Sequence, residues 1–353
     1  MKVLLLGASG LLGQNVFRQL LRDGYEVVAL VRSAERFLKS IGHYDAQSYI
    51  AYDDERDFHF EDGMSCEYQS VYEDRTVLFT VRQGSLLSYE HLLSAASGCD
   101  AIVNCAGTTD MSLLRYDDYL PVNVALCASL LRLMDDCAIG SLVHVSTANT
   151  IGFGSAAAPA SECAPMQPPF ADSFYARSKA EGERLLLDAA GLHPDRHIVI
   201  LNPGFIVGAY DLKPSSGQLL LAAYRKPLMV VPKGGKSFVT ASDAAVAVVN
   251  AVTLGRSGCR YLITGSNLSL REFYSLQASV CGYRQWLIPL PSWLALVAGR
   301  LGDLLRRCHI PTQLSSVNIR QLLVREYYDS AAARRDLRLP STPIAHAIKA
   351  FFA

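Results

Sequence analysis

The sequence lacks an excess of charge of either sign, because 33 lysines and arginines balance 33 aspartates and glutamates over 353 residues. Proteins that bind nucleic acid usually carry a basic stripe. None is visible here, so we expect no nucleic-acid partner. No uninterrupted apolar run reaches the roughly 18 residues that span a bilayer as a helix. The sequence therefore predicts neither a nucleic-acid-binding protein nor a transmembrane one.

The sequence also lacks paired cysteines. Its nine cysteines are scattered and none belongs to a CxxC motif. A chain of this length does not need disulfides to hold a core, so we expect reduced thiols and a cytoplasmic location. His193 and His197 are separated by a proline and have no third ligand nearby. We therefore predict no metal site.

What the sequence has is apolar residues, which make up 50% of the chain. Short apolar runs that predict buried strands alternate with segments of helical period. The expected strands are 2–7, 25–32, 76–86, 100–107, 141–147 and 197–204, and the first helices are 11–24, 89–98 and 122–137. This alternation predicts an α/β fold of the Rossmann type, a doubly wound parallel sheet covered by helices.

The second half of the chain is different, because strand-like runs become sparse after residue 204. We expect a dinucleotide-binding domain over 1–204, joined by 236–265, and a smaller, mostly helical substrate lobe made of 205–235 and 266–353. Residues 42–75 interrupt the first domain with a stretch rich in aspartate, glutamate and tyrosine. We interpret this stretch as an inserted lobe or hairpin of unknown role.

A glycine loop, GASGLLG at 7–13, follows the first expected strand and opens the first expected helix. Gly7, Gly10 and Gly13 permit a tight turn and let backbone approach a pyrophosphate, which the helix N-terminus attracts. Ser9 adds a hydroxyl for the phosphate. At this position in the fold the loop favours dinucleotide binding over a turn without a ligand.

The tip of the second strand carries arginine instead of an acidic residue. An aspartate or glutamate there would accept from the ribose 2′-OH of NAD, whereas arginine suits the 2′-phosphate of NADP. Arg32 ends this strand and Arg36 follows one helical turn later. We therefore expect NADP(H) to be favoured over NAD(H), although an arginine that only covers the adenine would also accept NAD.

Six motifs occur in a fixed order, and in that order they resemble the extended short-chain dehydrogenase/reductase family. They are GASGLLG, NCAG (104–107), Asn123 in VNVALCASLL, HVSTANTIG (144–152), YARSK (175–179) and NPGFIVG (202–208). The second half, at 257–303 and 326–352, is similar to the dihydroflavonol-reductase-like branch, which includes 3β-hydroxysteroid dehydrogenase-type enzymes. Two departures are Ser85, where the family usually has an aspartate, and the 42–75 insertion.

The resemblance implies a catalytic trio of Thr147, Tyr175 and Lys179. Tyrosine has an unperturbed pKa near 10, and a nearby ammonium favours the phenolate. Residues four apart on a helix are neighbours, so Tyr175 and Lys179 would be coupled. Tyr175 would exchange a proton with the substrate oxygen, and Thr147, or alternatively Ser146, would polarise that oxygen. A turn or helix-capping hydroxyl is the other interpretation of Thr147.

The same comparison implies the remaining site residues. The cofactor-binding residues are expected to be Gly7, Ser9, Gly10, Leu11, Leu12, Gly13, Arg32, Arg36, Ser85, Leu86, Cys105, Ala106, Gly107, Asn123, Tyr175, Lys179, Pro203, Phe205 and Ile206. The substrate is expected to meet Thr108, Thr109, Asp110 and Thr147. Asn123 is either a support for Lys179 through water or a buried structural asparagine. His144 is interpreted as a core histidine that points away from the site.

These features predict an NADP(H)-dependent oxidoreductase that interconverts a carbonyl and an alcohol on a small, fairly apolar molecule. One alternative is a nucleotide-sugar epimerase or dehydratase with tightly bound NAD, which would need an arginine clamp for the diphosphate. The candidates for that clamp are Arg225, Arg256, Arg260 and Arg271. A non-catalytic dinucleotide-binding sensor is the second alternative. The sequence leaves a homodimer open and does not name the substrate.

The segment 291–307, PSWLALVAGRLGDLLRR, predicts an amphipathic helix with arginines toward its end. The favoured interpretation is that its leucines point inward and close the substrate lobe. The alternative is that they face a lipid surface, as in interfacial helices.

Overall fold

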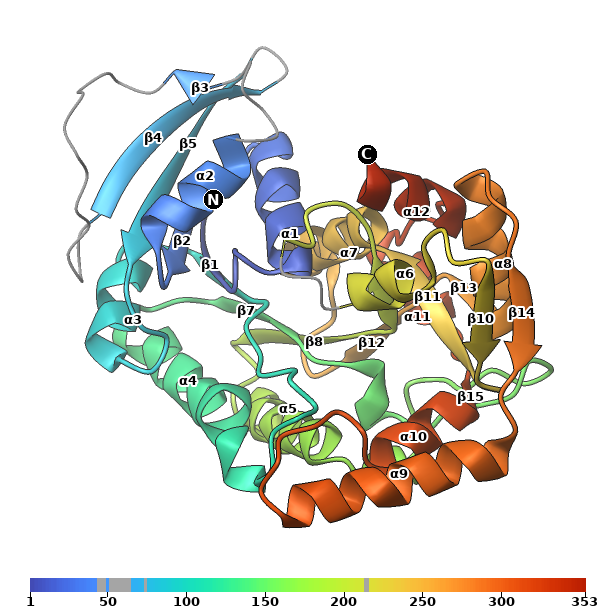
Figure 1. The fold of residues 1–353 in the computed structure, drawn as a ribbon. Helices are drawn as coiled ribbons and strands as arrows, with labels where there is room; N and C mark the ends of the chain where they lie inside the picture. The colour runs from blue at the N-terminus through green and yellow to red at the C-terminus, as the bar shows by residue number, and fades with distance from the viewer. Residues whose placement is uncertain (43–48, 51–64, 73–74, 213–215) are drawn as a thin grey trace.

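The computed structural model describes residues 1–353 except 43–48, 51–64, 73–74 and 213–215. Figure 1 shows a large twisted sheet between helices, with a second group of helices and short strands beside it. The blue-to-green first half of the chain builds most of the sheet, and the yellow-to-red second half builds most of the second group. This arrangement is the Rossmann-like α/β fold that the sequence predicts.

The large sheet contains seven parallel strands in the order β12-β8-β7-β6-β1-β2-β5. Strand β1 lies at its centre, between β2 and β6, and the chain order reverses there. These strands are apolar runs because helices cover both faces of the sheet. Their bounds are β1 Lys2–Leu6, β2 Glu26–Val31, β5 Arg75–Gln83, β6 Ala101–Asn104, β7 Ser141–Val145, β8 His197–Pro203 and β12 Arg260–Ile263.

Two helical layers enclose the sheet, and alternate residues of β1 contact different layers. Val3 and Leu5 belong to a core shared with α1, α2, α7 and α11, whereas Leu4 and Leu6 belong to a core shared with α3, α4 and α5. The strand period of two explains this division. The helices are α1 Leu11–Arg22, α2 Ala34–Gly42, α3 Tyr89–Ala96, α4 Leu126–Asp136, α5 Phe174–Leu192, α7 Ala241–Leu254 and α11 Ala331–Leu337.

The insertion extends one edge of the sheet. Strand β4 (Ser65–Tyr72) pairs antiparallel with β5, and the short β3 (Tyr49–Ile50) pairs with β4. The hairpin expected for this segment is therefore present in its described part. Residues 43–48, 51–64 and 73–74 of the predicted insertion lie outside the described residues.

The second group contains more strands than the sequence predicts. A small sheet has the order β13-β11-β15 with β9 also paired to β11, and β10 pairs with β14 as a separate ribbon. These strands have only two to six residues, too few for a clear period. Their bounds, with those of the helices beside them, are β9 Phe205–Val207, β10 Leu228–Val231, β11 Gly235–Thr240, β13 Ser266–Ser269, β14 Trp286–Pro289, β15 Arg325–Glu326, α6 Gly217–Ala223, α8 Leu270–Val280, α9 Ser292–Arg307, α10 Ser316–Leu323 and α12 Ile344–Phe352.

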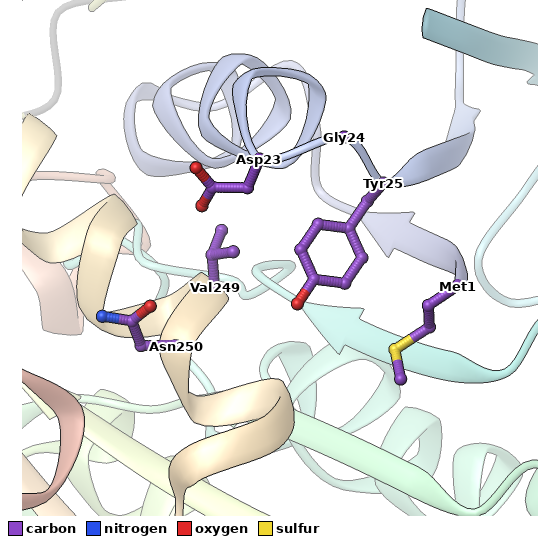
Figure 2. Close-up of a pocket in the computed structure, with 6 residues that line it drawn as sticks. All are labelled: Met1, Asp23, Gly24, Tyr25, Val249 and Asn250. Atoms are coloured by element: carbon purple, nitrogen blue, oxygen red, sulfur yellow. The ribbon is translucent and has the colours of Figure 1, made fainter.

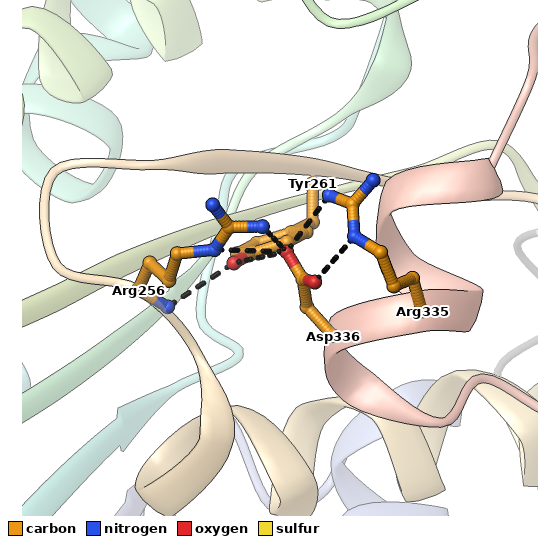
Figure 3. A network of polar contacts seen from close by, with 4 residues as sticks. All are labelled: Arg256, Tyr261, Arg335 and Asp336. Atoms are coloured by element: carbon orange, nitrogen blue, oxygen red, sulfur yellow. Dashed lines mark hydrogen bonds and ion pairs between the residues drawn. The ribbon is translucent and has the colours of Figure 1, made fainter.

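A polar network ties the late part of the chain to the large sheet. Asp336 on α11 accepts hydrogen bonds from Arg256, Tyr261 and Arg335, as Figure 3 shows. The two guanidinium groups lower the pKa of Asp336. Arg256 follows α7 and Tyr261 lies in β12, so the network joins three elements.

Candidate functional site

The site lies at the carboxyl ends of β1 and β6, where the strand order reverses. The backbone N–H of Cys105 donates to the carbonyl of Leu6 at 2.9 Å, which holds the two strand ends together. Gly7 has a φ of +76°, and a Cβ there would lie 2.6 Å from the backbone nitrogen of Ala106. Only glycine fits this approach. Open α/β sheets bind their ligands at such a reversal point.

The glycine loop forms a cradle at the start of α1. A Cβ on Gly13 would lie 2.0 Å from the carbonyl oxygen of Gly7, so the helix can begin this close to the turn only without a side chain. Gly10 is the N-cap, is exposed, and supplies no capping side chain to the first helical N–H groups. Ser9 is exposed beside it, Leu11 is half-buried and Leu12 is buried. These N–H groups fit a pyrophosphate.

The adenosine end of the predicted cofactor site lies at the tips of β2 and β5. Arg32 directly follows β2, Arg36 is in the first turn of α2, and both side chains are exposed. Ser85 is exposed after β5, and its hydroxyl accepts from the backbone N–H of Leu87 at 3.1 Å. Leu86 is half-buried. The two cations therefore lie at one strand tip, open to a ligand.

Tyr175 and Thr147 are in direct contact. Tyr175 is in the first turn of α5, and a side-chain hydrogen bond with Thr147 lowers its pKa, whereas burial raises that pKa more strongly, to about 12. Thr147 follows β7 and also caps the short 3₁₀ turn Ala148–Thr150, accepting from Asn149. The capping contact that the other interpretation of Thr147 expects is therefore present, and its role toward a substrate oxygen stays a prediction. The buried Ser146 hydroxyl has no partner in the part of the chain that the structure describes.

The expectation that Lys179 lowers the pKa of Tyr175 does not hold in this structure. Burial dominates, and Lys179 is turned toward the sheet. Its Nζ donates to the carbonyl of Val145 at 2.9 Å and lies 3.2 Å from Nε2 of His144. Burial also lowers the pKa of Lys179 itself. The tyrosine is therefore held protonated, as a proton donor must be.

His144 belongs to the site, which the sequence analysis did not expect. It is buried as predicted, but its side chain reaches Lys179. Its pKa is lowered well below the ordinary value by burial and then by Lys179. The residue therefore stays a neutral imidazole. Its position in β7 places it on the sheet face that α5 covers.

Hydrogen-bond directions around His144 are fixed by a backbone amide. The N–H of Ala106 donates to Oδ1 of Asn104 at 3.0 Å, so the Asn104 amide group is left facing Nδ1 of His144 at 3.0 Å. An amide N–H can only donate, so Nδ1 must accept and the imidazole proton must lie on Nε2. Nε2–H then faces Lys179. This arrangement agrees with the lowered pKa of Lys179.

Asn123 makes direct contacts with Thr108 and Ser178. It lies in the π-helical turn η2 (Pro121–Ala125) and is buried. Its side chain accepts from the N–H of Thr108 at 2.8 Å and donates to the carbonyl of Thr108 and to the hydroxyl of Ser178. The structural interpretation of Asn123 therefore has direct support. A Cβ on Gly107 would lie 3.5 Å from this side chain.

A buried network that sequence reasoning missed lies behind Thr147. Asn202 donates to the carbonyl of Thr147 at 3.0 Å and to the carboxylate of Glu183 at 2.7 Å. Glu183 also accepts from Thr150 and pairs with Arg260 at 3.6 Å. One feature of the sequence could have revealed this network. Glu183 is an acidic residue at a position of α5 where the helical period of apolar residues predicts burial.

A cavity of about 190 Å³ lies beside the start of α5, where Tyr175 is located. Its walls come from the 111–119 segment, from the residues before Tyr175 and from α9 and α10. The apolar part is Met111, Leu114, Phe174 and Val317, and the polar part is Tyr119, Asp172, Ser173, Asp303, Arg306, Ser315 and Asn318. The predicted substrate residues precede this segment.

The predicted substrate residues 108–110 directly precede the segment 111–119 that forms part of the cavity wall. Thr108 is half-buried and its backbone is held by Asn123, whereas Thr109 and Asp110 are exposed. Asp110 accepts from the backbone and the hydroxyl of Ser112, and its own carbonyl accepts from the hydroxyl of the buried Tyr119 at 2.6 Å. Asp110 thus shapes the turn.

The remaining predicted cofactor residues lie at the carboxyl ends of β6 and β8. Cys105 is half-buried, Ala106 is buried and Pro203 ends β8 as a buried residue. Phe205 and Ile206 are half-buried in β9, where the Phe205 ring meets Phe238 edge-on. Cys105 and Ala106 directly follow β6, which pairs with β1, the strand that the glycine loop follows.

A second pocket, more open and with a volume of about 430 Å³, lies far from this chemistry. Figure 2 shows Asp23 and Tyr25 facing Val249 and Asn250, with Met1 at the rim. Met1 precedes β1, so this pocket is at the amino ends of the strands, opposite the catalytic candidates. It contains none of the predicted site residues.

Helix α9 contradicts the favoured interpretation of its leucines. Trp293, Val297, Leu301 and Leu304 are all exposed, whereas the buried residues are Ala295, Gly299 and Gly302. The small residues allow close contact with α10, so the large apolar ones remain outside. No helix among the described residues is long and apolar enough to cross a membrane. Within those residues no cluster of three candidate metal ligands occurs either.

Several characterised proteins are similar to this chain over most of their length. One is the sterol demethylase protein B of Methylococcus capsulatus, 25% identical over 97% of this chain and 94% of that protein. Another is the 4-hydroxy-2-methyl-3-oxo-4-farnesyl-3,4-dihydroquinoline-1-oxide ketoreductase of Stigmatella aurantiaca, 28% identical over 88% of this chain and 82% of that protein.

Solved structures share the fold. The UDP-glucose-4-epimerase of Stenotrophomonas maltophila, with bound NAD and formylated UDP-arabinopyranose, aligns with a TM-score of 0.71 at 18% identity, covering 99% of this chain and 96% of that one. The sequence model of one enzyme family, whose members use a nicotinamide dinucleotide and act on small molecules, matches residues 3–263. This chain therefore belongs to the NAD dependent epimerase/dehydratase family.

Proposed function

We propose that this enzyme is an NADP(H)-dependent oxidoreductase that interconverts a carbonyl and an alcohol on a small, fairly apolar molecule. The observation that carries the proposal is the contact between the Thr147 and Tyr175 side chains beside a partly apolar cavity. A hydroxyl pair of this kind suits a substrate oxygen that gains a proton. The ketoreductase relative, whose named substrate carries a farnesyl chain, supports the same chemistry.

A bound nicotinamide dinucleotide would supply or accept the hydride. The chain's own residues would do the rest. The N–H groups after Gly10 would bind the pyrophosphate, and Arg32 and Arg36 the 2′-phosphate of NADP. Tyr175 would donate its proton to the substrate oxygen, while Thr147 holds that oxygen in place. The Glu183–Asn202 network would keep Thr147 in position.

The epimerase alternative is weakened by the arginines that would have to clamp a diphosphate. Arg256 is bound to Asp336, as Figure 3 shows. Arg260 contacts Glu183 and the carbonyl of Glu162, and Arg271 donates to the carbonyl of Leu287. These three guanidinium groups therefore have partners within the protein, whereas Arg225 is exposed and lies over the ring of Tyr224. The cavity beside Tyr175 contains one arginine, Arg306, which donates to backbone carbonyls.

The test is to release and identify any dinucleotide that the purified protein retains, and then to follow NADPH oxidation with two sets of compounds. The first set contains apolar ketones and aldehydes, and the second contains UDP-sugars. Turnover of an apolar carbonyl with exchangeable NADPH supports the proposal. Retained NAD with interconversion of UDP-sugars supports the epimerase, and binding of NADPH without turnover of either set supports the sensor.

A further inference from the structure

The outer side of α9 carries exposed apolar side chains along most of its length. Trp293 is 66% exposed, Val297 54%, Leu301 58% and Leu304 55%. Figure 1 shows α9 along the lower edge of the molecule with α10 on its inner side. Apolar residues that follow one another on a single helix face form a continuous patch, which soluble proteins rarely leave uncovered.

The orientation of α9 is fixed by its small residues. A Cβ on Gly299 would lie 3.0 Å from Cα of Ser316, and one on Gly302 would lie 2.1 Å from the carbonyl oxygen of Leu314. The backbones are therefore too close for a leucine to turn inward. Rotation of the helix cannot bury the apolar face without first separating α9 from α10.

A second apolar face precedes α9 along the chain. In the parallel ribbon β10–β14, Leu228 is paired with Trp286 and Val230 with Ile288. All four side chains are exposed, Trp286 by 79%. Paired residues of neighbouring strands point to the same side of the sheet. Strand β14 leads into α9 through Leu290 and Pro291 (Figure 1).

The two segments that build these faces carry mostly positive charge. In residues 225–234 and 282–320 the single acidic residue is Asp303, which accepts hydrogen bonds from Ser316 and so faces α10. Exposed cations lie among the apolar residues of α9 and near the ends of the ribbon. The lysines and arginines of these two segments are Arg225, Lys226, Lys233, Arg284, Arg300, Arg306, Arg307 and Arg320. Two of them have partners within the protein, because Arg306 donates to backbone carbonyls and Arg320 pairs with Asp172.

We propose that α9 and the β10–β14 ribbon bind the surface of an anionic lipid bilayer. Tryptophan prefers the boundary between water and hydrocarbon, and arginine can bury its stem while its guanidinium reaches the headgroups. A second copy of this chain would bring the same positive charges against each other, so it fits less well. The surface lies outside the proposed catalytic trio, and the proposal does not depend on the substrate.

Vesicle flotation tests the proposal. The full-length protein is mixed with vesicles of phosphatidylcholine alone or with added phosphatidylglycerol. We expect it to float with the anionic vesicles at low salt and less at high salt, because salt screens exposed charges. The double variant W293S/L301S is expected to stay at the bottom. The double variant R300Q/R307Q is expected to lose the preference for anionic vesicles.

Matched controls come from α5. L192S removes a leucine that is 78% exposed, and R184Q removes an exposed arginine, so both should float like the wild type. Unchanged melting temperature and dinucleotide binding show that each variant is folded. Wild-type protein that remains at the bottom overturns the proposal, as does flotation that survives the α9 variants. A third outcome would assign the face to a second copy of the chain. In that case the wild type does not float but sediments as a dimer, and the W293S/L301S variant sediments as a monomer.

Discussion

The amine of Lys179 lies 3.2 Å from Nε2 of His144, on the side of the imidazole that must carry the proton. Lys179 is also surrounded by Cys105, Cys127 and Glu183, all of which raise its pKa, yet desolvation lowers that pKa overall. In this structure the lysine donates to the carbonyl of Val145 and its amine also faces Nε2 of His144. Ribose hydroxyls of a dinucleotide would offer it new partners and solvation by polar groups.

From this pair we predict that dinucleotide binding takes up a proton at Lys179. The buffer would supply this proton, so the measured enthalpy of dinucleotide binding at pH 8 should depend on the ionisation enthalpy of the buffer. Isothermal titration calorimetry in phosphate and Tris measures it. The buffer dependence should disappear in K179M and persist in K39M, whose lysine is an exposed partner of Glu35. A wild-type heat that is equal in both buffers contradicts the prediction.

We further predict that K179M is more stable than the wild type when no dinucleotide is present. The folded-state pKa of Lys179 lies below its ordinary value of 10.5. The unfolded chain therefore binds more protons between the two values, and the wild type gains stability as pH rises through that window. The advantage of K179M should be largest at low pH and should shrink toward pH 10.5. Urea unfolding across this range measures it. If the difference in free energy of unfolding between K179M and the wild type does not change with pH, the cause is the packing of the methionine and not the charge of the lysine.

Tyr175→Phe should retain the fold and dinucleotide binding but lose turnover by about 100-fold or more, the usual cost of removing a general acid. The measurement is kcat on a substrate found with the apolar carbonyl panel. Tyr89→Phe is the control, because its hydroxyl contacts Asp136 outside the site. Near-normal kcat in Tyr175→Phe would remove this residue from the mechanism.

Arg32→Asp should reverse the preference from NADPH to NADH. The guanidinium would lose a charge-assisted bond to the 2′-phosphate, worth roughly 1.5–3 kcal/mol, and the new carboxylate would repel that group while accepting from a 2′-OH. Calorimetric Kd values for both dinucleotides decide this. Arg284→Asp changes the net charge equally at an exposed position outside the dinucleotide crevice and should leave the ratio unchanged. Equal affinities in the wild type would refute the NADP assignment.

Two glycines of one loop should respond differently to alanine. Gly13→Ala places a methyl group 2.0 Å from a carbonyl oxygen, so the melting temperature should fall by at least the equivalent of about 1–3 kcal/mol. At Gly10 the nearest atom would be 3.5 Å away and φ is −84°, so the fold should be retained. Its methyl group would instead meet the pyrophosphate. Thermal unfolding together with NADPH titration separates the two effects.

The parallel sheet was predictable because burial on both faces produces apolar runs that differ clearly from the helices between them. The ribbon β10–β14 was not, because four residues give too short a pattern. For α9 the period predicted the helix, and the small residues Ala295, Gly299 and Gly302 mark its covered face. Leucine was the more conspicuous signal, and it pointed to the wrong face.

The site shows the same limit. Strand alternation predicted that His144 points away from the site, and it could not reveal that the Lys179 side chain extends from α5 to this histidine. The relevant contacts join β7 to a residue 35 positions later. The Thr147–Tyr175 contact was accessible because family motifs mark both residues, whereas Glu183 and Asn202 act through a network that only the folded chain assembles.

Asn123 holds both the Thr108 backbone and Ser178, the neighbour of Lys179. The loop that leads to the cavity and the helix that carries the lysine therefore share one anchor. A ligand that shifts either segment must change the free energy of the other. By thermodynamic linkage, the factor by which dinucleotide changes the affinity for the carbonyl compound must equal the factor by which that compound changes the affinity for dinucleotide. Cooperativity between the two ligands would thus originate at a single amide.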